Sequence, residues 1–335
     1  MRSLAQFSIL ALVLLCPRQA FATLREIREV HYQMGTFLEL TLWHAEPERA
    51  RHLIRASVQE AHRLEEILSD YIPDSAVSQF NANAGKGRVA LPPELHELLR
   101  ISQRLSVRTA GYFDVTVGPL MELWRDCSDH DRIPDATRLA QALSLMGYRK
   151  LLLSQNGDAE LTRSGMKIDL GGIGKGYAVD RIAGRLKAAG VTAALINFGG
   201  SSMRAIGAPP GQNGWEVGVQ GPAGDLRGVI YLRNLALSTS GSMGRFFTVG
   251  NRRYGHLINP KSGMPVSEPR MASVITPSAT TAEALTKPLV LLGGKAMSLV
   301  KNFPQTEALV IPRTGALFFS SGFRSISAWQ ELPQS

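Results

Sequence analysis

Cysteine is scarce in this sequence, because only two of its 335 residues, Cys16 and Cys127, are cysteines. Cys16 lies in an N-terminal segment that we expect to be removed, so Cys127 would remain alone and no disulfide could form within the chain. The fold must then be stabilised by packing. No pattern pairs Cys127 with a histidine, so we predict a small hydrophobic side chain rather than a nucleophile.

Internal repeats, low-complexity tracts and long Pro/Gly/Ser linkers are also missing. We therefore predict a single domain over residues 23–335. The net charge is +9, but the positive residues are scattered, without a basic run or interleaved aromatic residues. This charge would suit an anionic partner such as a nucleotide, whereas its distribution argues against nucleic-acid binding.

The N-terminus carries an apolar run, residues 9–15, that is too short to span a bilayer. It follows Arg2 and precedes the small-residue site Ala20-Phe21-Ala22, which is typical of a secretory signal peptide over residues 1–22. A lipoprotein would carry a small residue before Cys16, where this chain has Leu15. We therefore expect a soluble exported protein.

Hydrophobic patterns predict the secondary structure. Helices are expected at residues 47–68, 93–108, 135–146 and 278–294, and a loop at 69–87. Strands are expected at 37–43, at 193–198, in a β-rich stretch from 215 to 249, in "MASVITPS", and as a pair in "EALVIP" and "GALFFSS". Strands and helices do not strictly alternate, which indicates an α+β (mixed α/β) fold with mixed sheets flanked by helices.

The segment "KIDLGGIGKGYAVD" predicts a short strand, a glycine-rich turn at residues 171–176 and a helix from about Tyr177. Such a turn lets backbone N–H groups and a helix N-terminus bind an anion, and Lys175 would pair with a phosphate. The glycine spacing fits neither the phosphate loop nor the dinucleotide pattern, so a tight structural turn is the alternative. A second glycine turn in "INFGGSS", with the amide of Asn197, could face the same cleft.

These motifs, together with "MGTFLEL", "LSDYIPDSAVSQFN", "GYFDVTVGPLMELW", "STSG", "GHLINPKSGMP" and "TAEALTKPLVLLG", occur in an order that resembles the flavin transferase (ApbE) family. The resemblance implies a two-lobed, exported enzyme that splits FAD, attaches FMN through its phosphate to a Thr or Ser of an acceptor protein, and releases AMP. It also implies that FAD lies between the lobes. The matching positions are Met34, Tyr71, Asp114, Gly172, Lys175, Asp180, Asn197, Ser240 and His256.

His256, in "YGHLINPKSG", matches the histidine that characterises the family, and the resemblance makes it the candidate general base for the acceptor hydroxyl. A histidine at a strand end that bonds to backbone is the alternative. Asn259 stands where many relatives have Asp. It removes a charge near His256, although an amide can still orient the ring.

The resemblance also implies a Mg²⁺ site with a carboxylate at Glu283, a hydroxyl at the position of Lys287 and a backbone carbonyl near Gly172. A protonated lysine cannot bind a metal ion. Glu283 and Lys287 are four residues apart and share one helix face, where they could instead form an ion pair with each other. Pro288 should bend or interrupt that helix.

Two explanations of the lysine remain open: Lys287 replaces part of the cation's charge at the pyrophosphate, or the site has decayed. The leading hypothesis is therefore a periplasmic FAD:protein FMN transferase with His256, Glu283 and Lys287 in its catalytic site. The alternatives are a non-catalytic FAD-binding protein of the same fold and a FAD pyrophosphatase. The resemblance suggests a membrane-associated redox subunit as acceptor, at the outer face of the inner membrane.

Overall fold

The computed structural model describes residues 23–242, 246–266 and 268–333. The predicted signal peptide at residues 1–22, including Cys16, lies outside the described residues. Among the described residues, no helix is both long enough and apolar enough to cross a membrane.

Helices and strands alternate irregularly along the chain. The α-helices are α1 (Pro47–Leu68), α2 (Ala76–Ala82), α3 (Pro93–Arg108), α4 (Gly118–Asp129), α5 (Ala136–Ser144), α6 (Gly174–Ala188), α7 (Ala279–Leu292), α8 (Met297–Val300) and α9 (Phe323–Ser327). The strands are β1 (Arg25–Gln33), β2 (Thr36–His44), β3 (Val89–Ala90), β4 (Leu151–Leu153), β5 (Asp158–Leu161), β6 (Ala194–Phe198), β7 (Ser202–Ile206), β8 (Trp215–Gln220), β9 (Leu226–Leu232), β10 (Ala236–Gly241), β11 (Phe246–Val249), β12 (Arg252–Gly255), β13 (Arg270–Thr276), β14 (Glu307–Pro312), β15 (Phe318–Phe319) and β16 (Gln330–Glu331).

An eight-stranded sheet, in the order β1-β2-β6-β7-β10-β13-β14-β15, forms the centre of the molecule. Every neighbouring pair of described strands in it is antiparallel. The predicted α+β class is confirmed, but the expected mixed sheets are antiparallel. One reason is that tight hairpins such as β1–β2 and β6–β7 join sequential strands, and a hairpin can join only antiparallel neighbours.

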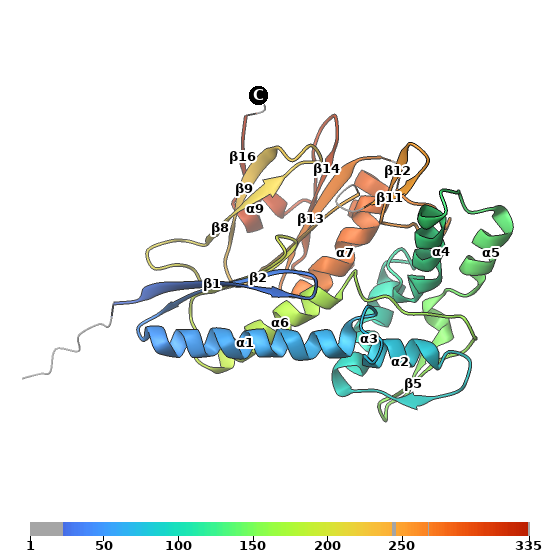
Figure 1. The fold of residues 1–335 in the computed structure, drawn as a ribbon. Coiled ribbons are helices and arrows are strands. Elements are labelled where there is room, and N and C mark those ends of the chain that lie inside the picture. The colour runs from blue at the N-terminus through green and yellow to red at the C-terminus, as the bar shows by residue number, and fades with distance from the viewer. Residues whose placement is uncertain (1–22, 243–245, 267, 334–335) are drawn as a thin grey trace, which may run out of the picture.

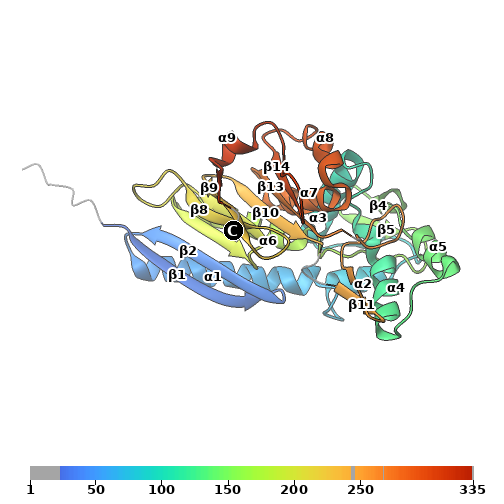
Figure 2. The same ribbon diagram turned by 90° about the horizontal axis from the view of Figure 1, so that it is seen from above.

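The central strands of this sheet are buried on both faces, which explains why strands such as β14 are apolar without alternation. Ala308 and Val310 of β14 pack in the core that includes α1, α6 and α7, whereas Leu309 and Ile311 belong to a second core with residues of β8 and β9. Figure 2 shows α1 alongside β1 and β2, with β8 and β9 nearby in the same part of the molecule. The sheet thus forms the middle layer.

A second lobe of helices lies at one end of the sheet, where α2, α4, α5 and β5 are grouped (Figure 1). A separate core surrounds Trp124 of α4, whose ring lies against Phe247 and Tyr254 of β11 and β12, whereas the buried residues of α2 and β5 belong to the main core. Cys127 is fully buried in this core, as a packing role predicts. The β11–β12 hairpin therefore connects the C-terminal half of the chain with the helical lobe.

Helices 47–68 and 93–108 are confirmed to the residue as α1 and α3, and the predicted pairing of β14 with β15 is confirmed. Other expectations about single elements were wrong. The loop predicted at 69–87 contains α2, the segment before the glycine turn is not a strand, and α6 begins at Gly174 rather than near Tyr177. Helix α7 also continues through Pro288 without interruption, because its apolar face is held between the sheet and α6.

Candidate functional site

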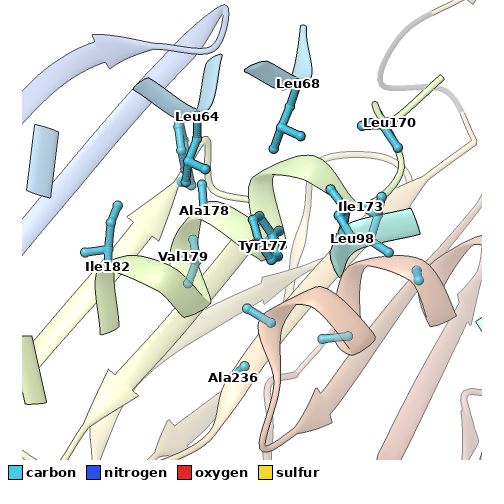
Figure 3. Packing of buried hydrophobic residues seen from close by; sticks show 14 of the residues in the cluster. Leu64, Leu68, Leu98, Leu170, Ile173, Tyr177, Ala178, Val179, Ile182 and Ala236 are labelled. Atoms are coloured by element: carbon cyan, nitrogen blue, oxygen red, sulfur yellow. The ribbon is translucent and has the colours of Figure 1, made fainter. Parts of the chain in front are cut away.

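The glycine loop is positioned by α6, which is held between α1, α3 and α7. Ile173 and Tyr177, at the start of α6, point into the same core as Leu98 of α3 and Leu68 of α1 (Figure 3). Gly176 lies where α6 and α7 touch, and a Cβ on it would lie 2.3 Å from the carbonyl oxygen of Ala279. Only glycine permits this approach, so the loop is fixed against α7.

The side chain of Glu283, on α7, lies against the N-terminal turn of α6. Its carboxylate is buried; Oε2 accepts a 2.6 Å hydrogen bond from the Gly176 N–H, and Oε1 lies 3.1 Å from Lys175 Nζ. A carboxylate at this position is favoured by the positive end of the helix dipole. Glu283 therefore fixes the position of the Lys175 ammonium at the glycine loop.

Lys287 lies one turn further along α7, on the same face. Its Nζ donates to Ser240 Oγ at 2.9 Å and to Thr286 Oγ1 at 3.3 Å. A Cβ on Gly172 would lie 3.1 Å from Lys287 Cε, so the lysine stem runs against the glycine loop. Burial lowers the pKa of Lys287 to about 8, an effect that the nearby Glu283 partly offsets.

The helical ion pair that the four-residue spacing allows does not form among the described residues, since Glu283 pairs with Lys175 and Lys287 bonds to hydroxyls. The reason is that α6 brings an ammonium closer to Glu283 than its own helix does. Both lysines and the carboxylate thus meet at one place, although they come from two helices.

Sequence reasoning missed Asp169, which also belongs to this cluster. Its Oδ1 accepts a 2.7 Å bond from the Gly171 N–H, and the charges of Lys175 and Lys287 act on it. Burial nevertheless raises the pKa of Asp169 above its ordinary value. An acid two residues before a glycine pair was the available signal, since such a side chain commonly bonds to the turn that follows it.

The three positions implied for Mg²⁺ come together, but their donors do not fit the ion. Magnesium requires oxygen ligands. Lys287 presents an ammonium, and both oxygens of Glu283 already bind N–H donors. The described residues contain no group of three or more His, Cys, Asp or Glu side chains that could hold a metal.

Met34 reaches the same region from the tip of the β1–β2 hairpin. Met34 and Gly35 both have positive φ, 48° and 72°, as a two-residue hairpin turn requires. A Cβ on Gly174 would lie 3.9 Å from Met34 Cε, which shows that the hairpin tip lies against the glycine loop. The second glycine turn is next to this hairpin, because Gly199 donates to the carbonyl of Phe37 at 2.7 Å.

The other predicted FAD-binding residues have structural partners. Asp180 accepts hydrogen bonds from the N–H groups of Ala279 and Thr280, both at 2.9 Å, and so caps α7. Asp114 is buried and accepts from Thr116 N at 2.8 Å; burial raises the pKa of Asp114. These contacts explain both carboxylates without a ligand.

Asn197 and Tyr71 differ in their surroundings. The amide oxygen of Asn197 accepts from Gly200 N at 3.0 Å within its own turn. Tyr71 is 75% exposed, and the Arg125 guanidinium lies 5.8 Å from its ring centre. Tyr71 therefore offers an open aromatic face rather than a buried contact.

His256 directly follows β12, as a strand-end histidine should. A Cβ on the preceding Gly255 would lie 2.2 Å from the carbonyl oxygen of Ser242, so this strand end touches the end of β10, which carries Ser240. Asn259 Oδ1 accepts from the Lys261 N–H at 2.9 Å. The amide oxygen therefore stabilises its own turn.

The ApbE family model matches residues 34–310. The FAD:protein FMN transferase of Treponema pallidum is 29% identical over 313 residues, which cover 87% of this chain and 85% of that protein. A FAD:protein FMN transferase of Klebsiella pneumoniae is 29% identical over 80% of this chain and 79% of its own.

Two solved structures agree in fold. The ApbE protein of Thermotoga maritima superposes with a TM-score of 0.81 at 28% identity, covering 90% of this chain and 99% of that chain. The Pseudomonas stutzeri flavinyl transferase ApbE gives 0.80 at 26% identity, covering 91% and 97%. Because the family model spans most of the sequence and the described fold superposes on these structures, the chain belongs to the ApbE family.

Proposed function

We propose that this protein transfers the FMN half of FAD to a Thr or Ser hydroxyl of an acceptor protein and releases AMP. One observation carries the proposal: the N-terminus of α6 and its glycine loop meet two lysine ammoniums, Lys175 and Lys287, beside a buried carboxylate. Membership of the ApbE family and the names of its relatives support it.

The diphosphate of FAD would be bound at the glycine loop. Phosphate oxygens would approach the loop at residues 171–174, where the glycines meet only side-chain atoms, because Gly176 lies against α7 and its N–H is bonded to Glu283. Lys175, oriented by Glu283, supplies a positive charge at the loop. Met34 at the hairpin tip and Tyr71 offer apolar contact surface for the rings of FAD.

In the chemical step, the acceptor hydroxyl oxygen attacks the phosphorus on the FMN side of the diphosphate. The bond from that phosphorus to the bridging oxygen breaks, and AMP leaves with the electron pair. His256 is proposed to accept the hydroxyl proton as general base. Positioning and charge neutralisation are the main requirements of such a transfer. No step is assigned to Mg²⁺, because the donors present do not fit it.

The proposal is tested by incubating the purified protein with FAD and an acceptor domain. A fluorescent acceptor band on a denaturing gel together with free AMP is the expected result. FMN and AMP released without a labelled acceptor would instead indicate a pyrophosphatase. FAD that stays bound and intact would indicate a non-catalytic flavin-binding protein.

We also propose that residues 1–22 direct export to the periplasm, where the acceptor would be a membrane-associated redox subunit at the outer face of the inner membrane. The apolar run and the Ala20-Phe21-Ala22 site support this. Fractionation of cells that produce the protein with and without residues 1–22 tests it. Cytoplasmic protein from both forms would contradict export.

A further inference from the structure

The position implied for a metal ion is filled by a side chain of this protein. The stem of Lys287 lies against Gly172, since a Cβ on that glycine would lie 3.1 Å from Lys287 Cε and 3.9 Å from Cγ. The glycine that the resemblance assigns to the ion is therefore next to a lysine. An ammonium would repel a divalent cation at this short range.

The ammonium is also held in a defined direction. Ser240 Oγ accepts from Lys287 Nζ at 2.9 Å, and Ser240 and Thr286 are themselves 2.8 Å apart. Thr286 in turn donates to the Glu283 carbonyl at 2.6 Å. An ammonium has three N–H donors, and within the described part of the chain two of them meet these hydroxyls. One donor remains for a ligand.

The surroundings of Lys287 favour an anionic ligand. Lys175 Nζ is bound to Glu283 at the same loop, so two ammoniums face a single fully buried carboxylate. Asp169, the other nearby acid, accepts a hydrogen bond from the Gly171 N–H, and the charge of Arg125 acts on it in addition to those of both lysines. A diphosphate carries negative charge that this pair of lysines can neutralise, because lysine acts as a point donor to phosphate.

We propose that the Lys287 ammonium supplies, from within the chain, the positive charge that a divalent ion would bring, so that FAD is bound and cleaved without Mg²⁺. The cleavage half of this inference rests on the proposed function, whereas the binding half does not. The site is then neither a vacant metal site nor a decayed one. Its cation is covalently part of α7.

The first test uses the unmodified protein. FMN transfer to an acceptor domain is measured in EDTA and across a series of MgCl₂ concentrations, and we expect the same rate throughout. Transfer that disappears in EDTA and returns with MgCl₂ would overturn the inference. No transfer under any condition, with FAD still bound, would count against the proposed function and the cleavage half alike.

The binding half is decided by calorimetry in EDTA with FAD and with riboflavin, which lacks phosphate. Lys287→Gln should weaken FAD binding by about 10- to 100-fold, the usual size of one charge-assisted hydrogen bond, and leave riboflavin binding unchanged. Lys295→Gln, which alters an exposed lysine just after α7, is the matched control. Equal FAD affinity of Lys287→Gln and the unmodified protein would contradict the proposal.

A third variant tests the exchange of cations directly. Lys287→Thr removes the ammonium and places a hydroxyl beside Glu283, so Mg²⁺ can compete with Lys175 for Glu283 Oε1; the variant should take up Mg²⁺ in calorimetry and show MgCl₂-dependent transfer, neither of which we expect of the unmodified protein. Magnesium uptake by the unmodified protein with the same affinity would show that Lys287 does not exclude the ion. Circular dichroism of each variant checks that it is folded.

Discussion

Two buried glutamates, Glu60 of α1 and Glu283 of α7, have side chains only 2% and 3% exposed, yet their cationic partners differ. Glu60 accepts from Arg63 at 3.0 and 3.1 Å and from Arg185 at 3.0 Å, with Arg181 at 3.7 Å. The hydrogen bond from Arg63 is the largest of the causes that lower the pKa of Glu60. This carboxylate is saturated by guanidiniums, so it serves to join α1 to α6.

Glu283 is bound by one ammonium and one backbone N–H, while the second ammonium, on Lys287, bonds to hydroxyls. Burial lowers the pKa of Lys287 by more than the nearby carboxylate of Glu283 raises it. A carboxylate surrounded by guanidiniums, such as Glu60, is thus a structural element. A carboxylate beside incompletely paired ammoniums, at a glycine loop, leaves charge for a ligand.

The largest expected effect on FMN transfer is that of replacing His256, compared with His96, a histidine that has a structural contact. His256→Ala should lower FMN transfer by about 10²- to 10⁴-fold, the usual contribution of a general base. His96 of α3, whose Nε2 bonds to the Ser154 carbonyl at 2.9 Å, is the comparison. His96→Ala should lower stability by about 1–2 kcal/mol and leave transfer unchanged. Similar turnover of both variants would remove His256 from the mechanism.

Glu283→Gln should lower transfer by about 100-fold, because Lys175 loses the partner that orients it and small displacements of a positioned group are costly. Steady-state rates with FAD and an acceptor domain measure the loss. Arg63→Gln, at the other glutamate, provides the control. If Glu283→Gln kept full activity, the carboxylate would have only a structural role.

Glu60→Gln should lower the stability of the protein and leave FMN transfer unchanged, unlike Glu283→Gln. The free energy of unfolding at neutral pH should fall by about 1–3 kcal/mol, because three half-exposed guanidiniums lose their common hydrogen-bond acceptor. Urea denaturation measures this change, and transfer per folded molecule should not change. A variant as stable as the parent would mean that the cluster contributes nothing to the α1–α6 contact.

The pH dependence of that difference follows from the sign of the pKa shift. The pKa of Glu60 lies below its ordinary value of 4.5 in the folded protein, so its contribution is present above that value and is lost as the pH falls through the folded pKa. The stability gap between Glu60→Gln and the parent should therefore narrow in acid. Denaturation curves of both proteins at several acidic pH values measure this stability gap. A gap that stays constant would contradict the prediction.

Gly172→Ala should have the smallest effect, a decrease of about tenfold in transfer, since the added Cβ displaces the flexible end of Lys287 rather than backbone. Gly184→Ala, at an exposed position of α6 with open space around it, is the control and should gain about 0.5–1 kcal/mol of stability. Equal transfer by both variants would indicate that Lys287 is not held against Gly172.

The sequence correctly predicted those helices that are defined by a local pattern of apolar residues. Helices 47–68 and 93–108 have long apolar stripes and a proline at the first position, which defines their start. Helix α4 received no prediction, and α2 was assigned to a loop, because short helices are fixed by their packing against other elements. Pro288 was expected to bend or interrupt α7; the helix is not interrupted, because burial between the sheet and α6 outweighs the loss of one hydrogen bond.

The sequence predicted which residues meet at the site, but not which of them bond to one another. The spacing of Glu283 and Lys287 correctly indicated one helix face, and the glycine motif correctly marked the loop that they meet. The choice of Lys175 as the partner of Glu283 depends on how α6 packs on α7, which no local pattern encodes. For the same reason, the capping of α7 by Asp180 could not be distinguished from a ligand contact.

The binding of the diphosphate by the two lysines can be seen in a solved structure of the protein with FAD, prepared without divalent ions. We expect the diphosphate at the glycine loop, within hydrogen-bond distance of the ammoniums of Lys175 and Lys287. FAD bound with its diphosphate away from both lysines, or no FAD bound at all, would contradict this expectation.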